Sequence, residues 1–175
     1  MNRPNHTDSA PDTSAAESLP ERLLPVADFE TEEFWAGCRN HKLLLQRCAD
    51  CGPYFYPRGF CPSCWRTDVE TFEASGRGSV YTYSVVHQNP MSPFRDRVPY
   101  VVAMIDLEEG PRMMTNIVGC EPGAVFGGMQ VEVCFEEHSG EHSGGEHSGG
   151  DAGAVSLPQF RPTAGAPGSQ IQQPT

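Results

Sequence analysis

The sequence contains no long apolar run and few basic residues for its length. No stretch of about 20 consecutive apolar residues occurs among its 175 residues, so we expect no membrane-spanning helix. The N-terminus also lacks the apolar core of a secretory signal. The formal net charge of −11 repels nucleic acid unless one face is locally basic. These features favour a cytoplasmic protein outside the membrane and argue against a nucleic-acid partner.

No recognisable catalytic set is present either. Three cysteines lie outside any paired motif, namely Cys38, Cys120 and Cys134, and none can be matched with a histidine as an activated nucleophile. Cys134 stands between Val133 and Phe135 in an apolar segment, where ordinary packing is the better interpretation. We therefore predict no catalytic residue in this chain and no turnover by the chain alone.

Large apolar residues are scarce at both ends of the chain. Residues 1–27 and 162–175 are rich in Pro, Ser, Ala, Thr, Gly and Gln, which predicts disordered tails. Between them we expect a helical segment with a metal ribbon over 28–67 and a barrel over 68–161. A His-Ser-Gly repeat at 138–150 is most simply an expanded hairpin loop within the barrel.

Four cysteines have the spacing of a metal site. Two Cys-x2-Cys pairs are separated by nine residues, and they consist of Cys48, Cys51, Cys61 and Cys64. Each pair can direct two sulfurs at one point, and two pairs close a tetrahedron around zinc at about 2.3 Å. In a reducing compartment metal is favoured over disulfides. Four thiolates leave no open position, so we predict a structural zinc site. Iron in a rubredoxin-like site, two disulfides and four unrelated buried cysteines remain the alternatives.

Local patterns predict the elements around this site. A short helix is expected over 31–41, capped by Thr31, with an apolar stripe that must dock on the ribbon, the barrel or another chain. Its members are Phe34, Trp35 and Cys38. Leu43–Leu45 begin a strand that leads into the first cysteine pair, and Tyr54–Pro57 form the returning strand of the ribbon.

The C-terminal half has strand-like alternation. We expect a tight turn at Glu109-Gly110-Pro111 and a long excursion between the third and fourth strands. This pattern favours a five-stranded barrel of the OB type, with a short sandwich as the alternative. The predicted strands are 78–88, 99–107, 111–119, 129–137 and 154–161.

Three surface features could bind ligands. Residues 37–66 hold five Lys or Arg and one Asp, which gives +4, or +2 once a zinc tetrathiolate of −2 is added. The cations either offset the metal centre or form a small anion-binding face. Tyr81, Tyr83, Val85 and His87 are expected to share one strand face, which either stacks on bases or packs against a neighbour. His138, His142 and His147 could bind a transition metal, although a solvated loop is the simpler interpretation.

Several segments together resemble a known protein family. They are Phe34-Trp35, the Leu43–Cys48 strand, both cysteine pairs, Gly76–Tyr81, Pro99–Val102, Gly128–Val131 and Leu157–Pro162. The chain resembles, over about residues 30–162, the zinc-ribbon plus OB-fold proteins that were classed as a domain of unknown function and are associated with acyl-CoA metabolism. Trp65 is a departure, since a glycine commonly follows the second cysteine pair in that family.

The resemblance implies a mainly β fold, with a short N-terminal helix and a rubredoxin-like zinc ribbon before an OB barrel. It also implies an accessory subunit that works beside a thiolase-like enzyme on acyl-CoA thioesters in thiolysis, condensation or retro-aldol cleavage, and that could help to hold the acyl-CoA. Single-stranded nucleic-acid binding is the alternative, since ribbons and OB barrels serve that role elsewhere. Residues 65–137, with five Arg against eleven Asp or Glu, argue against it.

Overall fold

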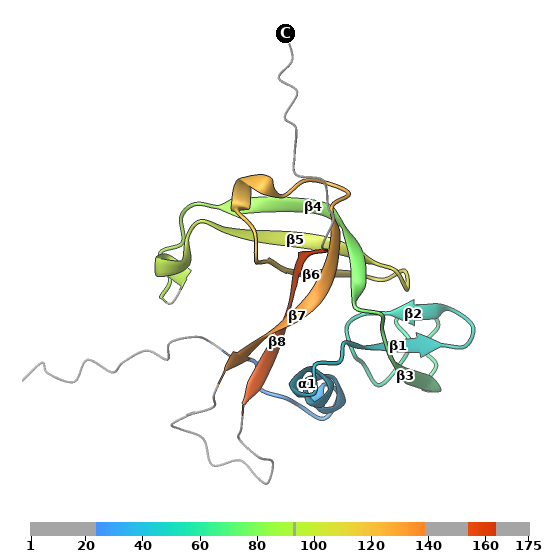
Figure 1. Ribbon diagram of the computed structural model, residues 1–175. Coiled ribbons are helices and arrows are strands. Elements are labelled where there is room, and N and C mark those ends of the chain that lie inside the picture. The colour runs from blue at the N-terminus through green and yellow to red at the C-terminus, as the bar shows by residue number, and fades with distance from the viewer. Residues whose placement is uncertain (1–23, 93, 139–153, 164–175) are drawn as a thin grey trace, which may run out of the picture.

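The computed structural model describes residues 24–92, 94–138 and 154–163, and it shows a helix and a small sheet beside a barrel (Figure 1). The predicted repeat loop and most of the two predicted tails lie outside these residues. The elements, in chain order, are α1 (Glu32–Arg39), β1 (Leu44–Cys48), β2 (Gly52–Tyr54), β3 (Val69–Glu73), β4 (Arg77–Val86), η1 (Phe94–Arg97), β5 (Tyr100–Leu107), β6 (Arg112–Ile117), η2 (Pro122–Ala124), β7 (Gln130–His138) and β8 (Val155–Pro162).

Five strands close into a barrel in the order β4-β5-β6-β8-β7. All neighbouring pairs are antiparallel except β6 and β8, which meet in parallel where Ile117 pairs with Phe160. This is the closed topology of the OB fold, so the predicted fold class is confirmed and the sandwich is excluded. All five predicted barrel strands are present.

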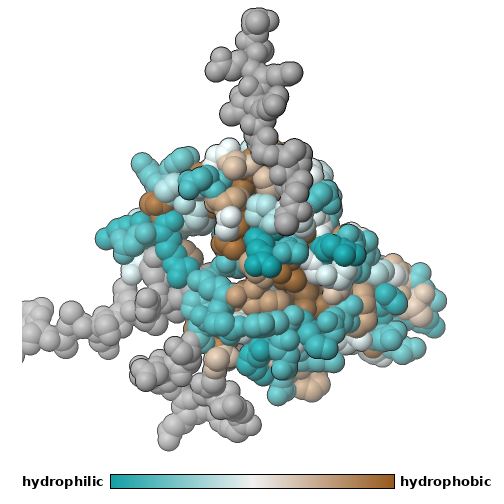
Figure 2. All heavy atoms as spheres, in the orientation of Figure 1, coloured by the Kyte–Doolittle hydropathy of each residue, from teal (hydrophilic) through white to brown (hydrophobic). Residues whose placement is uncertain are grey.

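The barrel is filled by side chains that alternate along its strands. On β5 the buried positions are Val101, Ala103, Ile105 and Leu107, and the residues between them are half-buried. Phe160 from β8 is fully buried at the centre. Each large apolar side chain that is fully buried contributes about 1.5–3 kcal/mol relative to exposure. Figure 2 shows hydrophilic residues over most of the described surface in this view, with apolar residues visible between the barrel and the ribbon.

The β5–β6 turn takes the predicted position. Gly110 has a φ of +108°, which glycine adopts without a side-chain clash, and its N–H donates to the Leu107 carbonyl at 2.9 Å. Leu107 in turn donates to the Pro111 carbonyl at 3.0 Å, which closes the hairpin.

Helix α1 docks within its own chain. Phe34 and Cys38 are buried, and the helix contacts both β1 of the ribbon and β8 of the barrel. Thr31 is the N-cap residue as expected, but its side chain makes no capping bond. Instead, the Asp28 carboxylate accepts the N–H groups of Glu30 and Thr31 at 3.1 and 2.9 Å. None of the helices among the described residues has the length and apolarity that crossing a bilayer requires.

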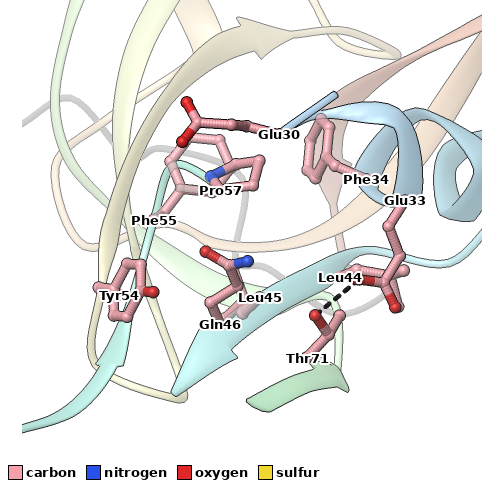
Figure 3. A pocket seen from close by; sticks show the side chains of 10 residues that line it. All are labelled: Glu30, Glu33, Phe34, Leu44, Leu45, Gln46, Tyr54, Phe55, Pro57 and Thr71. Atoms are coloured by element: carbon pink, nitrogen blue, oxygen red, sulfur yellow. Dashed lines mark hydrogen bonds between the residues drawn. The ribbon is translucent and has the colours of Figure 1, made fainter. Parts of the chain in front are cut away.

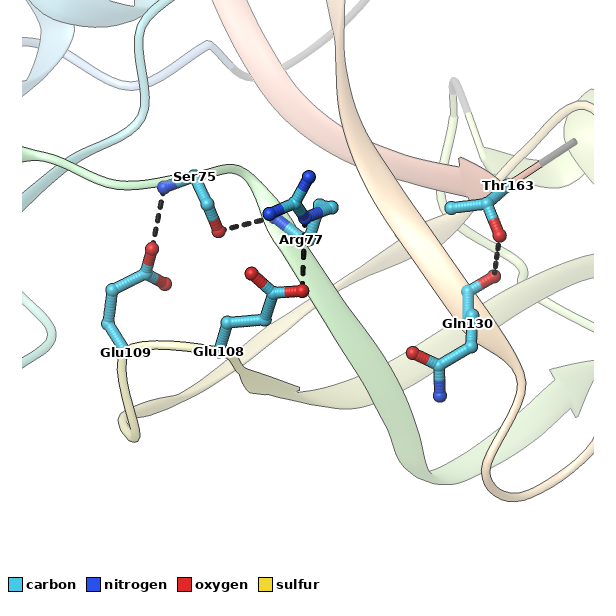
Figure 4. Close-up of polar contacts among 6 residues, drawn as sticks. All are labelled: Ser75, Arg77, Glu108, Glu109, Gln130 and Thr163. Atoms are coloured by element: carbon cyan, nitrogen blue, oxygen red, sulfur yellow. Dashed lines mark hydrogen bonds and ion pairs between the residues drawn. The ribbon is translucent and has the colours of Figure 1, made fainter.

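Polar contacts fix the connection between the ribbon and the barrel (Figure 4). The Ser75 N–H donates to Glu109 Oε1 at 2.6 Å, and the Arg77 Nε donates to Glu108 Oε1 at 3.0 Å. Gly76 between them has a φ of +71°, and its carbonyl accepts the Val133 N–H at 2.7 Å. The β5–β6 turn and strand β7 therefore hold the connecting segment from two sides.

Candidate metal centre

The four cysteines of the two pairs converge on one point. Their sulfur atoms all lie within 4.8 Å of one another, and the Sγ atoms of Cys48 and Cys64 are 3.6 Å apart. A tetrahedron of sulfurs at zinc–sulfur distances of about 2.3 Å has edges of about 3.8 Å, so the cluster is close to that size. Cys48 and Cys61 are buried, whereas Cys51 and Cys64 are at the surface.

Local backbone geometry brings each pair to this point. Cys48 of the first pair ends strand β1, Cys51 lies in the turn that follows, and Gly52, with a φ of +86°, begins β2. In the second pair the Cys61 N–H donates to the Arg66 carbonyl at 2.7 Å, and the Trp65 N–H donates to the Cys61 carbonyl at 2.9 Å. Trp65 has a φ of +65°, which is the conformation that glycine adopts readily. The residue after the second cysteine pair is therefore left-handed here, although it is a tryptophan and not a glycine.

The ribbon differs from the expectation in two respects. Strand β2 ends at Tyr54, before the predicted end at Pro57, and Phe55 and Tyr56 follow it outside the strand. Their ring centroids lie 5.8 and 5.6 Å from that of Phe34. Strand β3 was missed altogether. It pairs antiparallel with β1 along the whole of its length, from Val69 opposite Cys48 to Glu73 opposite Leu44. The β-branched Val69 and Thr71 were the available signal.

The neighbouring thiols of the cluster shift one another's pKa values. Burial opposes ionisation of Cys61, but hydrogen bonds from the backbone of Cys64 and Ser63 outweigh it and lower the pKa of the Cys61 thiol to about 7. Hydrogen bonding with Cys64, followed by burial, raises the pKa of Cys51 to about 12. Crowded thiolates repel each other, so they cannot all ionise without a cation among them. A divalent metal supplies that charge and favours deprotonation of every ligand.

The four-cysteine cluster has almost no hydrophobic core of its own. Its buried residues are Cys48, Tyr54 and Cys61, with Val69 packed against them, whereas the helix and the barrel share one large cluster. Hydrophobic burial alone offers little to hold the two knuckles together. A metal bound by the four sulfurs therefore fits this part of the chain as a structural element.

A small recess lies beside the cluster, between α1 and the ribbon strands (Figure 3). Apolar side chains such as Phe34, Leu45 and Phe55 form much of its lining. Glu33 accepts a hydrogen bond from Thr71 at 2.8 Å across the recess, which ties the helix to β3. With a volume of about 10 Å³ the recess is too small for an acyl chain, and the contacts that line it join the helix to the ribbon.

The cationic side chains of the ribbon and of the barrel differ in whether they form ion pairs with carboxylates. On the barrel, ion pairs join Arg77, Arg97, Arg112 and Arg161 to neighbouring carboxylates. On the ribbon side, Lys42 and Arg66 have carboxylate partners. Arg47 lies over the Phe72 ring at 4.2 Å, and neither it nor Arg58 forms an ion pair within the described part of the chain. The paired barrel cations are poorly placed for nucleic-acid phosphates.

The expected aromatic face on β4 is wrong. A register shift between Val80 and Thr82 makes a bulge, after which Tyr83 pairs with the buried Ala103. Tyr81 lies in the bulge instead, under the Arg112 guanidinium at 3.3 Å from the ring centroid. The two tyrosines therefore point to opposite faces of the sheet, and His87 lies beyond the end of β4.

The remaining cysteines and histidines are separate from the cluster. Burial raises the pKa of Cys38 to about 12, and it is also the main cause of the raised pKa of Cys120 and of Cys134. A raised pKa disfavours the thiolate that a nucleophile needs. His138 ends β7 and lies 3.5 Å from Glu136, whereas His142 and His147 fall outside the described residues.

Comparisons with known proteins agree with this geometry. Residues 35–70 match the rubredoxin-like zinc ribbon domain of ChsH2, and residues 72–136 match the C-terminal OB-fold domain of ChsH2. A DUF35 domain-containing scaffold protein of Methanocaldococcus jannaschii is 50% identical over 95 residues, which cover 53% of this chain and 67% of that protein. The chain belongs to the DUF35 family. The resemblance inferred from its sequence segments is thereby confirmed.

Two further relatives carry enzyme-subunit names. A probable enoyl-CoA hydratase alpha subunit of Thermomonospora curvata is 36% identical over 86% of this chain and 43% of its own length. The benzoylsuccinyl-CoA thiolase subunit BbsA of Geobacter metallireducens is 30% identical over 42% of this chain and 48% of its own length. The chain thus spans less than half of each of these two relatives.

One solved structure resembles this DUF35 chain along most of its length. It is described as an Ltp2-ChsH2(DUF35) aldolase, and it matches with a TM-score of 0.62 and 32% identity over 81% of this chain and 100% of the matched chain.

Proposed function

We propose that this DUF35 chain is a non-catalytic accessory subunit of a thiolase-like enzyme complex that acts on acyl-CoA thioesters. The observation that carries the proposal is the match to scaffold proteins and enzyme subunits over both the ribbon and the barrel. The chain's own side chains support a role in assembly, because a closed four-thiol cluster has no position left for a substrate.

We further propose that the metal is zinc, bound by Cys48, Cys51, Cys61 and Cys64. Zinc at this site would serve the fold alone, by joining the two knuckles that have little apolar core between them. The chain's contribution to the reaction would then be to hold its partner, and acyl-CoA where the two chains meet.

Co-expression with a thiolase-like protein from the same organism tests the assembly. We expect the two chains to copurify and to elute as one hetero-oligomer, with its mass determined by light scattering. Obligate partners stabilise each other by mutual burial, so the midpoint of thermal unfolding of the partner should rise when this chain is added. Two chains that elute separately at micromolar concentration, with unchanged melting, would contradict the proposal.

A further inference from the structure

Trp65, on the second knuckle, is a large aromatic side chain that lies mostly at the surface. Its exposed fraction is 72%, and its ring stacks on that of Phe60 with centroids 5.1 Å apart and planes inclined by 12°. Phe60 and Trp65 together form a flat aromatic platform on the surface of the ribbon. A stacked pair holds both rings in place, so little side-chain freedom remains to be lost when a partner binds.

The backbone accommodates this tryptophan at a cost. Within the described residues, His41 and Trp65 are the non-glycine residues with a positive φ, and for a bulky side chain this region is destabilising. Glycine adopts the same φ without a clash. The indole is mostly exposed and stacks on one ring, so it contributes little to the stability of its own chain. The exposed indole is therefore available for contacts outside the chain.

The charges near the platform indicate what it would meet. Arg66 is neutralised by Asp50, so the indole is next to a paired cation. Arg58 lies two residues before Phe60 in the sequence and forms no ion pair within the described ranges. An apolar recess with carboxylates on its rim would match a flat aromatic surface that an unpaired arginine precedes in the sequence. Tryptophan and arginine are the side chains most enriched at energetically dominant interface positions.

We propose that the Phe60–Trp65 platform is the anchor by which this chain docks on its thiolase-like partner, in an apolar recess rimmed by carboxylates. This inference rests on the proposed function, because it assigns the contact surface for that assembly. Of the two exposed tyrosines on the barrel, Tyr81 lies under the Arg112 guanidinium, which is itself bound by Asp106 at 2.6 Å, and Tyr83 is 40% exposed against 72% for Trp65.

Trp65→Gly in the full-length, metal-loaded chain separates docking from folding. We expect the Kd for the purified partner, measured by biolayer interferometry, to rise at least about tenfold. The midpoint of thermal unfolding of the isolated chain should not fall, and the metal content should stay unchanged, because glycine suits the φ of +65°. Trp65→Asn, which also tolerates this conformation, should behave in the same way.

Met114→Ala on the barrel is the matched control, because Met114 is also exposed and apolar. It should leave the Kd unchanged. Arg58→Gln should weaken association and reduce its dependence on salt. A wild-type chain that fails to bind would overturn the proposed function itself. Wild-type binding that Trp65→Gly and Trp65→Asn leave unaltered would overturn this inference alone. So would a loss of thermal stability or metal in both variants, since the indole would then serve its own fold.

Discussion

His41 Nε2 lies 2.5 Å from Glu137 Oε1, and this contact joins the residues that follow α1 to the β7–β8 hairpin. The His41 ring also stacks on Phe135 with centroids 5.3 Å apart. The second oxygen of Glu137 accepts a hydrogen bond from the Ser156 hydroxyl at 2.7 Å. The bond from Ser156, followed by the bond with His41, lowers the pKa of Glu137 below its ordinary value of 4.5. One carboxylate thus connects the helix-ribbon part of the chain to the barrel.

Glu137→Gln should lower the free energy of unfolding by a few tenths to about 1 kcal/mol, because the ion pair is solvent-exposed and screened. The sign of the pH dependence follows from the depressed pKa. The stabilisation is present above pH 4.5 and is lost as the pH falls through the lower pKa of the folded state. Urea unfolding of both proteins across this range measures the difference. Glu121→Gln, at an exposed position, is the control and should show little change. A Glu137→Gln effect that grows as the pH falls below 4.5 would contradict the assignment.

Gly78 lies where the backbone of strand β4 comes close to that of strand β5. A Cβ at this position would lie 2.5 Å from the Asp106 carbonyl oxygen and 2.7 Å from Ile105 Cγ2. Because a backbone atom cannot move aside cheaply, Gly78→Ala should cost about 1–3 kcal/mol in unfolding free energy. Gly123→Ala, which meets nothing within 4 Å, is the matched control and should be close to neutral. Equal stabilities of the two variants in urea would disprove the close approach.

Phe34 and Trp35 lie next to each other on helix α1 but differ in burial. Phe34 is 3% exposed and contacts Trp35, Phe55 and Tyr56, so Phe34→Ala should cost about 3–5 kcal/mol. Trp35 is half-buried against the same cluster, so Trp35→Ala should cost less and should leave the Kd for the partner unchanged. Thermal unfolding and binding measured on the same samples decide this. Weaker partner binding by a Trp35→Ala chain of normal stability would place the stripe at the interface instead.

The sequence predicted the fold and the metal site best where a local pattern corresponds to a single kind of structure. Paired cysteines indicated the metal cluster, and the alternation of β5 indicated the barrel wall. Strand β3 was missed because its stabilisation comes from pairing with β1, which is distant in sequence. The bulge at Tyr81 was missed because a period of two does not reveal where a strand gains a residue. Both errors concern pairing between strands, which local patterns do not encode.

Zinc binding predicts a defined metal content and a defined response to acid. Freshly purified protein should hold about one zinc per chain, with sulfur neighbours alone at about 2.3 Å by X-ray absorption. Acidification should release the metal, because protons compete for the thiolates. Cys61→Ser should lose zinc, whereas Cys134→Ser, at a cysteine outside the cluster, should retain it. Elemental analysis that finds iron would correct the identity of the metal, and equal zinc in both variants would refute the site.

Turnover of a CoA thioester by the thiolase-like partner, measured with and without this chain, tests the central claim most directly. The account predicts no turnover by this chain alone, little by the partner alone, and full activity only when both are present in a fixed ratio. Cys38→Ser should leave the activity of the complex intact, because burial keeps that thiol protonated and away from chemistry. A partner that is fully active and stable without this chain, or turnover by this chain alone, would contradict its role as a non-catalytic accessory subunit.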